Sequence, residues 1–235
     1  MTTTTATTAR EVGTVFVTGG ASGLGAAVVR AVRDAGGTPA VLDLHAADDV
    51  PSVAVDLADS GAVPGAVADL VAQVGPPSAV VTAAGIDACG PLLDIDADAW
   101  ERVVRVNLFG TVATIRACLP YLEETHGTVV TVASTLALRG VSDATAYCAS
   151  KWGVRGFTQA LAAELAGRVG VTLLVPGGMR TPFFDGRTEQ YKPGPDADLQ
   201  DPAHTAVAVL AALRQPRGSE IREMLVMAPG ESSWP

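Results

Sequence analysis

Residues 14–35 place a short apolar strand, a glycine-rich turn and a helix in direct succession. Residues 14–18 are apolar and largely β-branched, as expected of a buried strand. The turn at 19–25 is rich in glycine, and 26–35 has the pattern of a helix that ends at two glycines. Glycines let a phosphate approach the backbone, and a helix N-terminus offers free N–H groups to it. This order predicts a dinucleotide-binding turn, with a plain strand-to-helix turn as the alternative.

Two other glycine motifs do not fit this turn. No Gly-Lys-Ser/Thr follows it, which disfavours the phosphate loop of nucleoside triphosphatases. Ser22 does not lie in Gly-x-Ser-x-Gly, so the turn does not support a hydrolase nucleophile.

The alternation of strand and helix continues along the chain. Further strands are predicted at residues 39–43, 53–57, 79–82, 127–134, 171–175 and 223–227. Helices are predicted at about 60–74, 98–121, 145–168 and 201–214, and the helix at 98–121 begins with a capping box of Asp98 and Glu101. Strands separated by helices predict an α/β fold: a doubly wound, Rossmann-like parallel sheet of about seven strands, with helices on both faces.

The length of 235 residues suits one domain, and 48% of the residues are hydrophobic. Residues 1–9 are threonine-rich and uncharged, unlike a signal or transit peptide, so we expect a disordered tail at 1–12 and a single domain at 13–235. The net charge of −9, without a basic stripe, argues against nucleic acid and anionic membranes as partners. No apolar run approaches the length that a membrane span needs.

Cysteine usage and acidic spacing predict no metal site. Cys89, Cys118 and Cys148 are odd in number and fit no metal-binding spacing, which indicates reduced thiols and a cytoplasmic location. The acidic run that starts at Asp94 resembles the start of a calcium loop, but Ala99 stands where that loop needs glycine.

Several small or polar residues lie where predicted strands end, at the edge where ligands bind in such sheets. They are Asp43, Asp56, the segment 82–85, Ser134 and the pair Pro176 and Gly177. Asp43 follows the glycine turn at about the distance at which an acid meets the adenosine ribose. A carboxylate there favours NAD over NADP, and no arginine stands directly after it or within the turn.

Tyr147 and Lys151 are four residues apart on a predicted helix, so their side chains share one face. A nearby ammonium favours the phenolate and would lower the pKa of Tyr147, which suits a general acid or base. Ser134, at the end of a strand, could hydrogen-bond the same reacting oxygen. Asn107 lies among apolar residues inside a helix, either as a satisfied polar residue or as a mark of local distortion. Taken alone, Tyr147 and Lys151 could also be a chance pair on a solvated face.

The turn-rich segment at 179–200 is predicted to be a substrate lid, with a disordered surface loop as the alternative. The predicted substrate walls are 87–91, 136–141 and 179–191. Their Leu, Met and Phe content suits a hydrophobic or cyclic alcohol, whereas Asp87, Asp185 and Arg187 could equally bind polar groups.

From residue 13 to at least 181 the chain resembles the short-chain dehydrogenase/reductase family, in its compact one-domain branch. Thr18-Gly19-x-x-x-Gly23-x-Gly25, Asp56-Leu57, Ala83-Ala84-Gly85 and Pro176-Gly177 with Thr181 match its cofactor motifs. The catalytic tetrad is matched by Asn107, Ser134, Tyr147 and Lys151. The predicted cofactor-binding residues are Gly19, Ser22, Gly23, Leu24, Gly25, Asp43, Asp56, Leu57, Ala83, Ala84, Gly85, Tyr147, Lys151, Pro176, Gly177 and Thr181. The predicted substrate-binding residues are Ser134, Leu136, Tyr147, Met179 and Phe183.

The resemblance implies a role for each residue of the tetrad. Tyr147 would exchange a proton with the substrate oxygen, and Ser134 would orient that oxygen. Lys151 would lower the pKa of Tyr147 and bind the nicotinamide ribose, and Asn107 would hold a water through its distorted helix. Two features depart from the family: Thr82 replaces its usual asparagine, and the C-terminal end lacks its glycine-rich sequence. The family's usual assembly implies a homotetramer or homodimer.

The leading hypothesis is an oxidoreductase that transfers a hydride between NAD(H) and a secondary alcohol or ketone. One alternative is a regulator or scaffold that binds NAD(H) without catalysis. Another is an epimerase or dehydratase of the same superfamily, but those enzymes carry a longer C-terminal substrate domain than the segment after Val175 provides.

Overall fold

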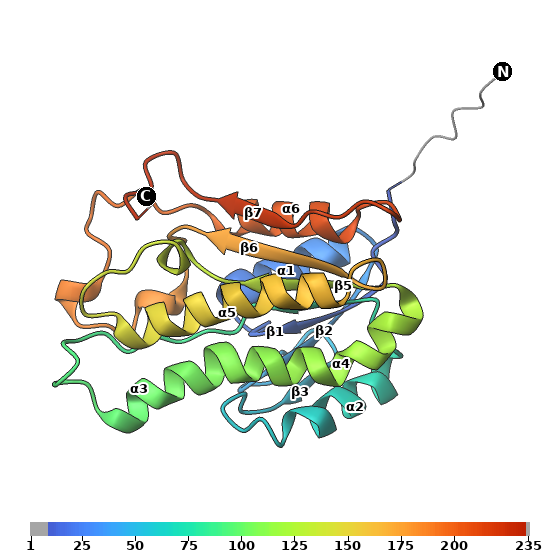
Figure 1. Cartoon of the computed structure of the whole chain (residues 1–235), viewed down its shortest axis with the longest axis horizontal. Helices are drawn as coiled ribbons and strands as arrows, with labels where there is room; N and C mark the ends of the chain where they lie inside the picture. Colours follow the sequence, from blue (N-terminus) through green and yellow to red (C-terminus); the bar gives the residue numbers. More distant parts are fainter. Residues whose placement is uncertain (1–8, 234–235) are drawn as a thin grey trace.

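A computed structural model describes residues 9–233 of the chain (Figure 1). The strands are β1 (Thr14–Thr18), β2 (Thr38–Asp43), β3 (Ser52–Ala54), β4 (Ala79–Thr82), β5 (Thr128–Val132), β6 (Gly170–Pro176) and β7 (Glu223–Val226). The helices are α1 (Gly23–Asp34), α2 (Val63–Val74), α3 (Ala97–Val104), α4 (Thr111–Thr125), α5 (Thr145–Glu164) and α6 (Pro202–Leu213). The expected tail at 1–12 lies mostly outside the described residues; within them, Val12 is buried.

The seven strands form one parallel sheet in the order β3-β2-β1-β4-β5-β6-β7. The order reverses between β1 and β4, which pair with Val17 opposite Val81. The predicted doubly wound α/β fold is therefore confirmed. In such a sheet the carboxyl ends of the strands next to the reversal form a crevice, which is the usual place for a ligand.

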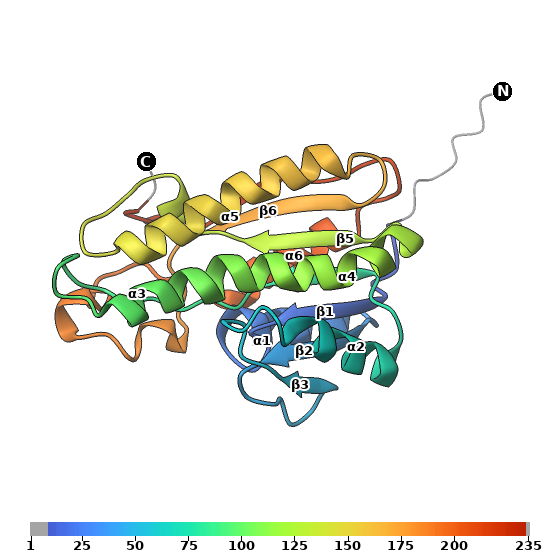
Figure 2. The same cartoon turned by 60° about the horizontal axis from the view of Figure 1, so that its bottom comes forward.

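Helices cover both faces of the sheet, because the central strands are apolar on both sides. Helices α1 and α6 pack with β1 and β4 through a cluster that includes Val28, Val32 and Val209. Helices α2, α4 and α5 form the other layer, around Phe16 and Ile115. Figures 1 and 2 show these two layers on opposite sides of the strands. Two-sided burial fixes the strands and so places their carboxyl ends.

Some predicted boundaries are wrong. The helix after the glycine turn begins at Gly23, inside the predicted turn. Strand β3 ends at Ala54, so Asp56 lies in the loop beyond it. Asp96, and not Asp98, caps α3, because its carboxylate accepts a hydrogen bond from the Ala99 amide at 3.0 Å. The backbone at 96 has the extended conformation of a cap, which composition alone does not reveal.

One long helical stretch, Ala97–Thr125, is formed by α3, a π-helical segment η1 (Arg105–Gly110) and α4. By length and composition it could cross a membrane. The prediction that no apolar run approaches the length of a membrane span is therefore wrong by these two criteria. Length and composition are weak evidence, because core helices pass the same test. Here Ile115, Cys118 and Leu122 of this stretch are buried against the sheet.

Candidate active site

A cavity of about 830 Å³ opens at the carboxyl edge of the sheet. It brings together segments from the whole chain, because β1, β2, β4, β5 and β6 all end there. The residues named above as cofactor-binding and as substrate-binding all line it, including Ser134, Tyr147 and Lys151, whereas none of the predicted wall at 87–91 does. Asn107 does not line the cavity and is fully buried behind it.

The glycine turn leaves room for a phosphate at the start of α1. Gly19 has a φ of 70°, and a Cβ there would lie 2.7 Å from the Ala84 Cα. At Gly25 a Cβ would lie 2.0 Å from the Gly19 carbonyl oxygen. Ser22 precedes the helix without a capping hydrogen bond from its side chain, and the first turn contains no acidic residue. The first N–H groups of α1 thus face the cavity without a carboxylate beside them, which fits a dinucleotide phosphate.

Asp43 stands at the end of β2 beside the glycine turn. Its carboxylate accepts hydrogen bonds from the Ala21 amide at 3.0 Å and the His45 amide at 3.2 Å. These bonds fix the side chain at the cavity wall, which also contains Leu44. The two hydrogen bonds therefore hold the carboxylate between the glycine turn and the residue after β2.

Asp56 is engaged by neighbouring groups. The Ala58 amide donates to its carboxylate at 2.9 Å, and Arg102 donates two hydrogen bonds at 3.0 and 3.2 Å. The Ala58 hydrogen bond and, to a lesser extent, Arg102 hold the pKa of Asp56 below its ordinary value, against the opposing effect of burial. Asp56 and Leu57 both line the cavity, as predicted for residues that contact adenine.

Thr82 occupies the position of the asparagine that is usual in the family. Its hydroxyl is buried and has no hydrogen-bond partner among residues 9–233. The neighbouring loop is tied to β1 in another way, because the Ala84 amide donates to the Thr18 hydroxyl at 3.2 Å. The expected change in local bonding at Thr82 is thus visible.

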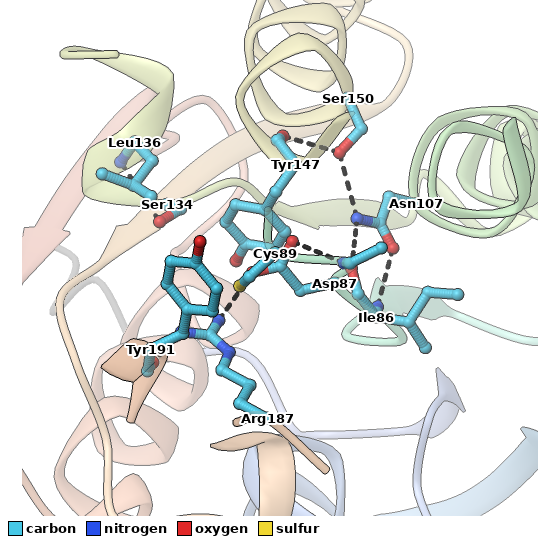
Figure 3. A network of polar contacts seen from close by, with 11 residues as sticks. Ile86, Asp87, Cys89, Asn107, Ser134, Leu136, Tyr147, Ser150, Arg187 and Tyr191 are labelled. Atoms are coloured by element: carbon cyan, nitrogen blue, oxygen red, sulfur yellow. Dashed lines mark hydrogen bonds and ion pairs between the residues drawn. The ribbon is translucent and has the colours of Figure 1, made fainter. Parts of the chain in front are cut away.

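Asn107 lies within η1, so the helix is distorted at this residue. Its amide nitrogen donates to the Ile86 carbonyl at 2.9 Å and to the Ser150 hydroxyl at 3.0 Å. Its amide oxygen accepts from the Ile86 N–H at 2.8 Å (Figure 3). Asn107 therefore joins the loop after β4 to α5. Ile86 and Ser150 are partners that the sequence did not reveal.

Lys151 is buried at 3% exposure, and its ammonium donates to the Val132 carbonyl at 2.9 Å. Its Nζ lies 5.6 Å from the centre of the Tyr147 ring. Burial lowers the pKa of Lys151 to about 8. One helical turn thus brings the two side chains together, as their spacing predicted.

The expected lowering of the pKa of Tyr147 is not found in the protein alone. Burial raises the pKa of Tyr147 well above its ordinary value, and a hydrogen bond with Ser134 opposes this rise. The charge of Asp87 raises the pKa further, while that of Arg187 lowers it. The phenol is therefore protonated at neutral pH in the cofactor-free protein. The spacing argument omitted the desolvation of the ring, which is the largest effect.

Ser134 lies two residues after the end of β5. Its hydroxyl accepts a hydrogen bond from the Leu136 amide at 3.2 Å. This bond caps a short helical turn, Thr135–Ala137. The hydrogen bond between the Ser134 hydroxyl and Tyr147 is the one that lowers the pKa of the phenol. Figure 3 shows Ser134 and Tyr147 on neighbouring segments.

The segment 179–200, which we call the lid, lies along the cavity, and many of its residues line it. A bridge between Met179 and Gln200 closes its base, and two short helical turns, Pro182–Phe184 and Glu189–Tyr191, shape it. The Phe183 ring lies 5.6 Å from the Tyr147 ring, centre to centre. Phe183 of this segment therefore packs at a tilt against the phenol ring of Tyr147.

Two sets of contacts at the cavity were not foreseen. Arg187 in the lid forms an ion pair of 2.7 Å with Asp87. Near the C-terminus, the Glu231 carboxylate accepts from the Gly178 amide at 2.6 Å, and Ser233 shares a hydrogen bond of 2.6 Å with Thr135. Neither set of contacts can be predicted from the sequence, because the partners are far apart along the chain. The charged residues of the lid were the one feature that pointed to polar contacts there.

The model of the family described as short chain dehydrogenase matches residues 13–192. The chain belongs to the short-chain dehydrogenase family. A dehydrogenase from Sphingomonas sp. (strain SKA58), named 2-dehydro-3-deoxy-L-rhamnonate dehydrogenase (NAD(+)), is 37% identical over 182 residues, which cover 72% of this chain and 73% of that protein. The trans-4-hydroxycyclohexanecarboxylate dehydrogenase of Sinomonas cyclohexanicum is 31% identical, over 63% of this chain and 59% of that protein.

A solved structure shares the fold: an alcohol dehydrogenase from the archaeon Thermococcus sibiricus, complexed with 5-hydroxy-NADP. Its TM-score is 0.79 at 23% identity, over 91% of this chain and 95% of that one. The family and its dehydrogenase relatives make this chain an oxidoreductase with a nicotinamide cofactor and a small-molecule substrate. Within residues 9–233 no cluster of His, Cys, Asp and Glu is placed to hold a metal ion.

Proposed function

We propose that this protein transfers a hydride between NAD(H) and a secondary alcohol or ketone, with Tyr147 as the general acid and base. The supporting observation is that Ser134, Tyr147 and Lys151 line the same cavity as the glycine turn, with Asn107 bound directly behind them. The names of both relatives end in dehydrogenase, and one names a hydroxylated carboxylate, which supports a hydroxyl as the reacting group.

In this mechanism the chain positions the substrate and moves one proton. The Ser134 hydroxyl donates to the reacting oxygen, and Tyr147 gives a proton to that oxygen in reduction or takes one from it in oxidation. Lys151 lies beside the phenol and stabilises its phenolate form when charged. When bound, the nicotinamide supplies the hydride acceptor or donor. Since the pKa of Tyr147 is raised in the protein alone, we expect alcohol oxidation to become faster as the pH rises.

NAD as the preferred cofactor is part of this proposal. The Asp43 carboxylate at the cavity wall would accept from ribose hydroxyls and would repel a 2′-phosphate. The fold itself does not decide the choice, because a relative in structure holds an NADP derivative. We also propose a cytoplasmic location and a homotetramer or homodimer.

Tyr147→Phe tests the proposal. We expect this variant to bind NAD+ with unchanged affinity, because the phenol oxygen is lost while the glycine turn remains. Its turnover on a panel of secondary alcohols, followed by NADH absorbance, should fall by about a hundredfold or more. Tyr121→Phe is the matched control and should keep full activity, because Tyr121 is a half-buried residue of α4 that does not line the cavity.

Two outcomes would decide against this function. Undiminished turnover in Tyr147→Phe would remove the proposed acid and base. Failure of the wild-type protein on a broad panel of alcohols and ketones, with intact NAD+ binding, would favour the regulator that binds NAD(H) without catalysis.

A further inference from the structure

The lid contributes a partly buried ion pair that lies one aromatic ring away from the phenol of Tyr147. Arg187 and Asp87 have side-chain exposures of 19% and 5%, and their charged atoms lie 2.7 Å apart. Figure 3 shows Arg187 and Tyr191 reaching from the lid toward Asp87 and Cys89. Isolated buried charges are costly, so a pair at this place needs either good compensation or a use in binding.

Aromatic rings fix the orientation of the guanidinium. Its central carbon lies 5.0 Å from the centre of the Phe183 ring and 4.7 Å from that of Phe184. Phe183 in turn stacks on Tyr147. The three side chains Tyr147, Phe183 and Arg187 therefore form a short series, and Arg187 lies one ring beyond the phenol.

The hydrogen bonds of Arg187 are incomplete. One terminal nitrogen donates to Asp87 at 2.7 Å, and the other donates to the Tyr191 carbonyl at 3.2 Å. The Nε atom is buried and has no hydrogen-bond partner in the part of the chain that the structure describes. A buried N–H without an acceptor is rare and unfavourable, so the chain itself does not fully satisfy this guanidinium.

The surrounding space can accommodate such a partner. Arg187 lines the main cavity, and it also lines a smaller adjoining cavity of about 310 Å³. Asp87, Cys89 and Tyr191 line the smaller cavity with it. Polar groups therefore lie on one side of Arg187 and the two phenylalanine rings on the other, whereas Leu136 and Val141 form an apolar part of the main cavity wall.

We propose that Arg187 binds a second oxygen function of the substrate, on the side of Phe183 opposite to the reacting carbon. This inference rests on the proposed function, because it takes Tyr147 as the site of reaction. The substrate class is a hydroxylated compound with a further hydroxyl or carboxylate group, and not a plain hydrophobic alcohol. Asp87 holds the guanidinium in place and can accept a hydrogen bond from a substrate hydroxyl.

The first measurement compares matched substrates on the wild-type protein. The probes are 2-pentanol, pentane-1,4-diol and 4-hydroxypentanoate, each with homologues one and two carbons longer, oxidised with NAD+. We expect kcat/KM at least tenfold higher for the best diol or hydroxy acid than for its 2-alkanol. A higher value for the hydroxy acid identifies a carboxylate as the second group, and a higher value for the diol identifies a hydroxyl.

Variants then test whether Arg187 causes the preference. Arg187→Met leaves Asp87 buried without its ion pair, so the double variant Asp87→Asn/Arg187→Met is measured beside it. In either folded variant the preference, taken as kcat/KM for the oxygen-bearing substrate divided by kcat/KM for its 2-alkanol on the same variant, should fall at least fivefold, and the Kd for NAD+ should change less than threefold. Arg116→Met, an exposed arginine on α4, is the control and should keep the preference.

The outcomes separate this inference from the function beneath it. A 2-alkanol oxidised as well as its oxygen-bearing partners would overturn the inference and leave the hydride transfer standing. An equal loss for all substrates in both variants would also overturn it, because it would show a merely structural role for the ion pair. If the wild-type protein oxidises none of the alcohols, the proposed function falls and the inference with it.

Discussion

The two ends of the cavity, which we assign to the cofactor and to the substrate, differ in whether backbone groups or side chains form them. At the cofactor end, the glycine turn and the start of α1 present mainly backbone groups, and Asp43 is held by two backbone amides. At the substrate end, side chains form the site. Lys151 and Asn107 are buried there, and Arg187 of the lid pairs with Asp87 of the loop after β4. Backbone geometry suits a ligand part that many proteins share, whereas side chains can be exchanged to suit one substrate.

The two ends also differ in electrostatics. Burial raises the pKa of Tyr147 and lowers that of Lys151 to about 8, so both groups are less charged than they would be in water. Perturbed groups of this kind are typical of catalytic sites. Variants at the substrate end should therefore alter pH dependence and turnover, and variants at the cofactor end should alter cofactor affinity.

Lys151→Met should produce the largest change, in the pH dependence of stability. The pKa of Lys151 is lowered from 10.5 to about 8 in the folded protein. Between these values the unfolded chain binds more protons, so this group makes the folded state more stable as the pH rises. The unfolding free energy of wild type minus that of Lys151→Met should increase by up to about 3 kcal/mol between pH 7 and 10.5.

Urea unfolding of the cofactor-free proteins at several pH values measures this difference. Lys192→Met is the control, since Lys192 is the other lysine of the chain and pairs with Glu189 in the lid. If the difference in unfolding free energy between wild type and Lys151→Met stays constant from pH 7 to 10.5, the lowered pKa of Lys151 is contradicted.

Gly25→Ala should weaken the cofactor end. Its Cβ would meet the Gly19 carbonyl oxygen at 2.0 Å, so the turn must shift away from its present shape. We expect the Kd for NAD+, measured by calorimetry, to rise roughly 10- to 100-fold, which corresponds to the usual 1–3 kcal/mol for overpacking. Gly65→Ala on the exposed side of α2, where nothing lies within 4 Å, should bind NAD+ normally. An unchanged Kd in Gly25→Ala would show that the turn is not the cofactor site.

Asp43→Asn should have the smallest effect and the most specific one. Removal of the negative charge leaves the position of the side chain but lessens the repulsion of a 2′-phosphate. The ratio of the Kd for NADP+ to the Kd for NAD+ should fall about tenfold, or roughly 1.4 kcal/mol. Asp34→Asn at the end of α1 makes the same change in net charge and should keep the wild-type ratio. A wild-type protein that binds NADP+ more tightly than NAD+ would contradict the role given to Asp43.

The same contrast explains what could be predicted from the sequence. Gly19 to Gly25 lie next to one another, and the alternation of strands and helices fixes which residues reach the carboxyl edge; the fold and the family follow from these local patterns. Tyr147 and Lys151 meet because one helical turn separates them. These parts of the site depend on short distances along the chain.

Other parts depend on packing between distant segments. Arg187 and Asp87 are separated by 100 positions, and their contact requires the fold of the lid. The pKa of Tyr147 depends on how much water reaches the ring, which its neighbours in sequence do not determine. The link between Glu231 and Gly178 likewise joins the C-terminal segment to the loop after β6, and no motif marks it.

Transfer of deuterium tests the central claim most directly. A secondary alcohol that the protein oxidises is labelled with deuterium at the carbinol carbon and incubated with NAD+, and the reduced cofactor is examined by mass spectrometry. Hydride transfer predicts that one deuterium passes from this carbon to the nicotinamide ring, accompanied by net formation of the ketone. Reduced cofactor without deuterium, or exchange at the carbon without net ketone, would contradict the account, and the second result would favour an epimerase.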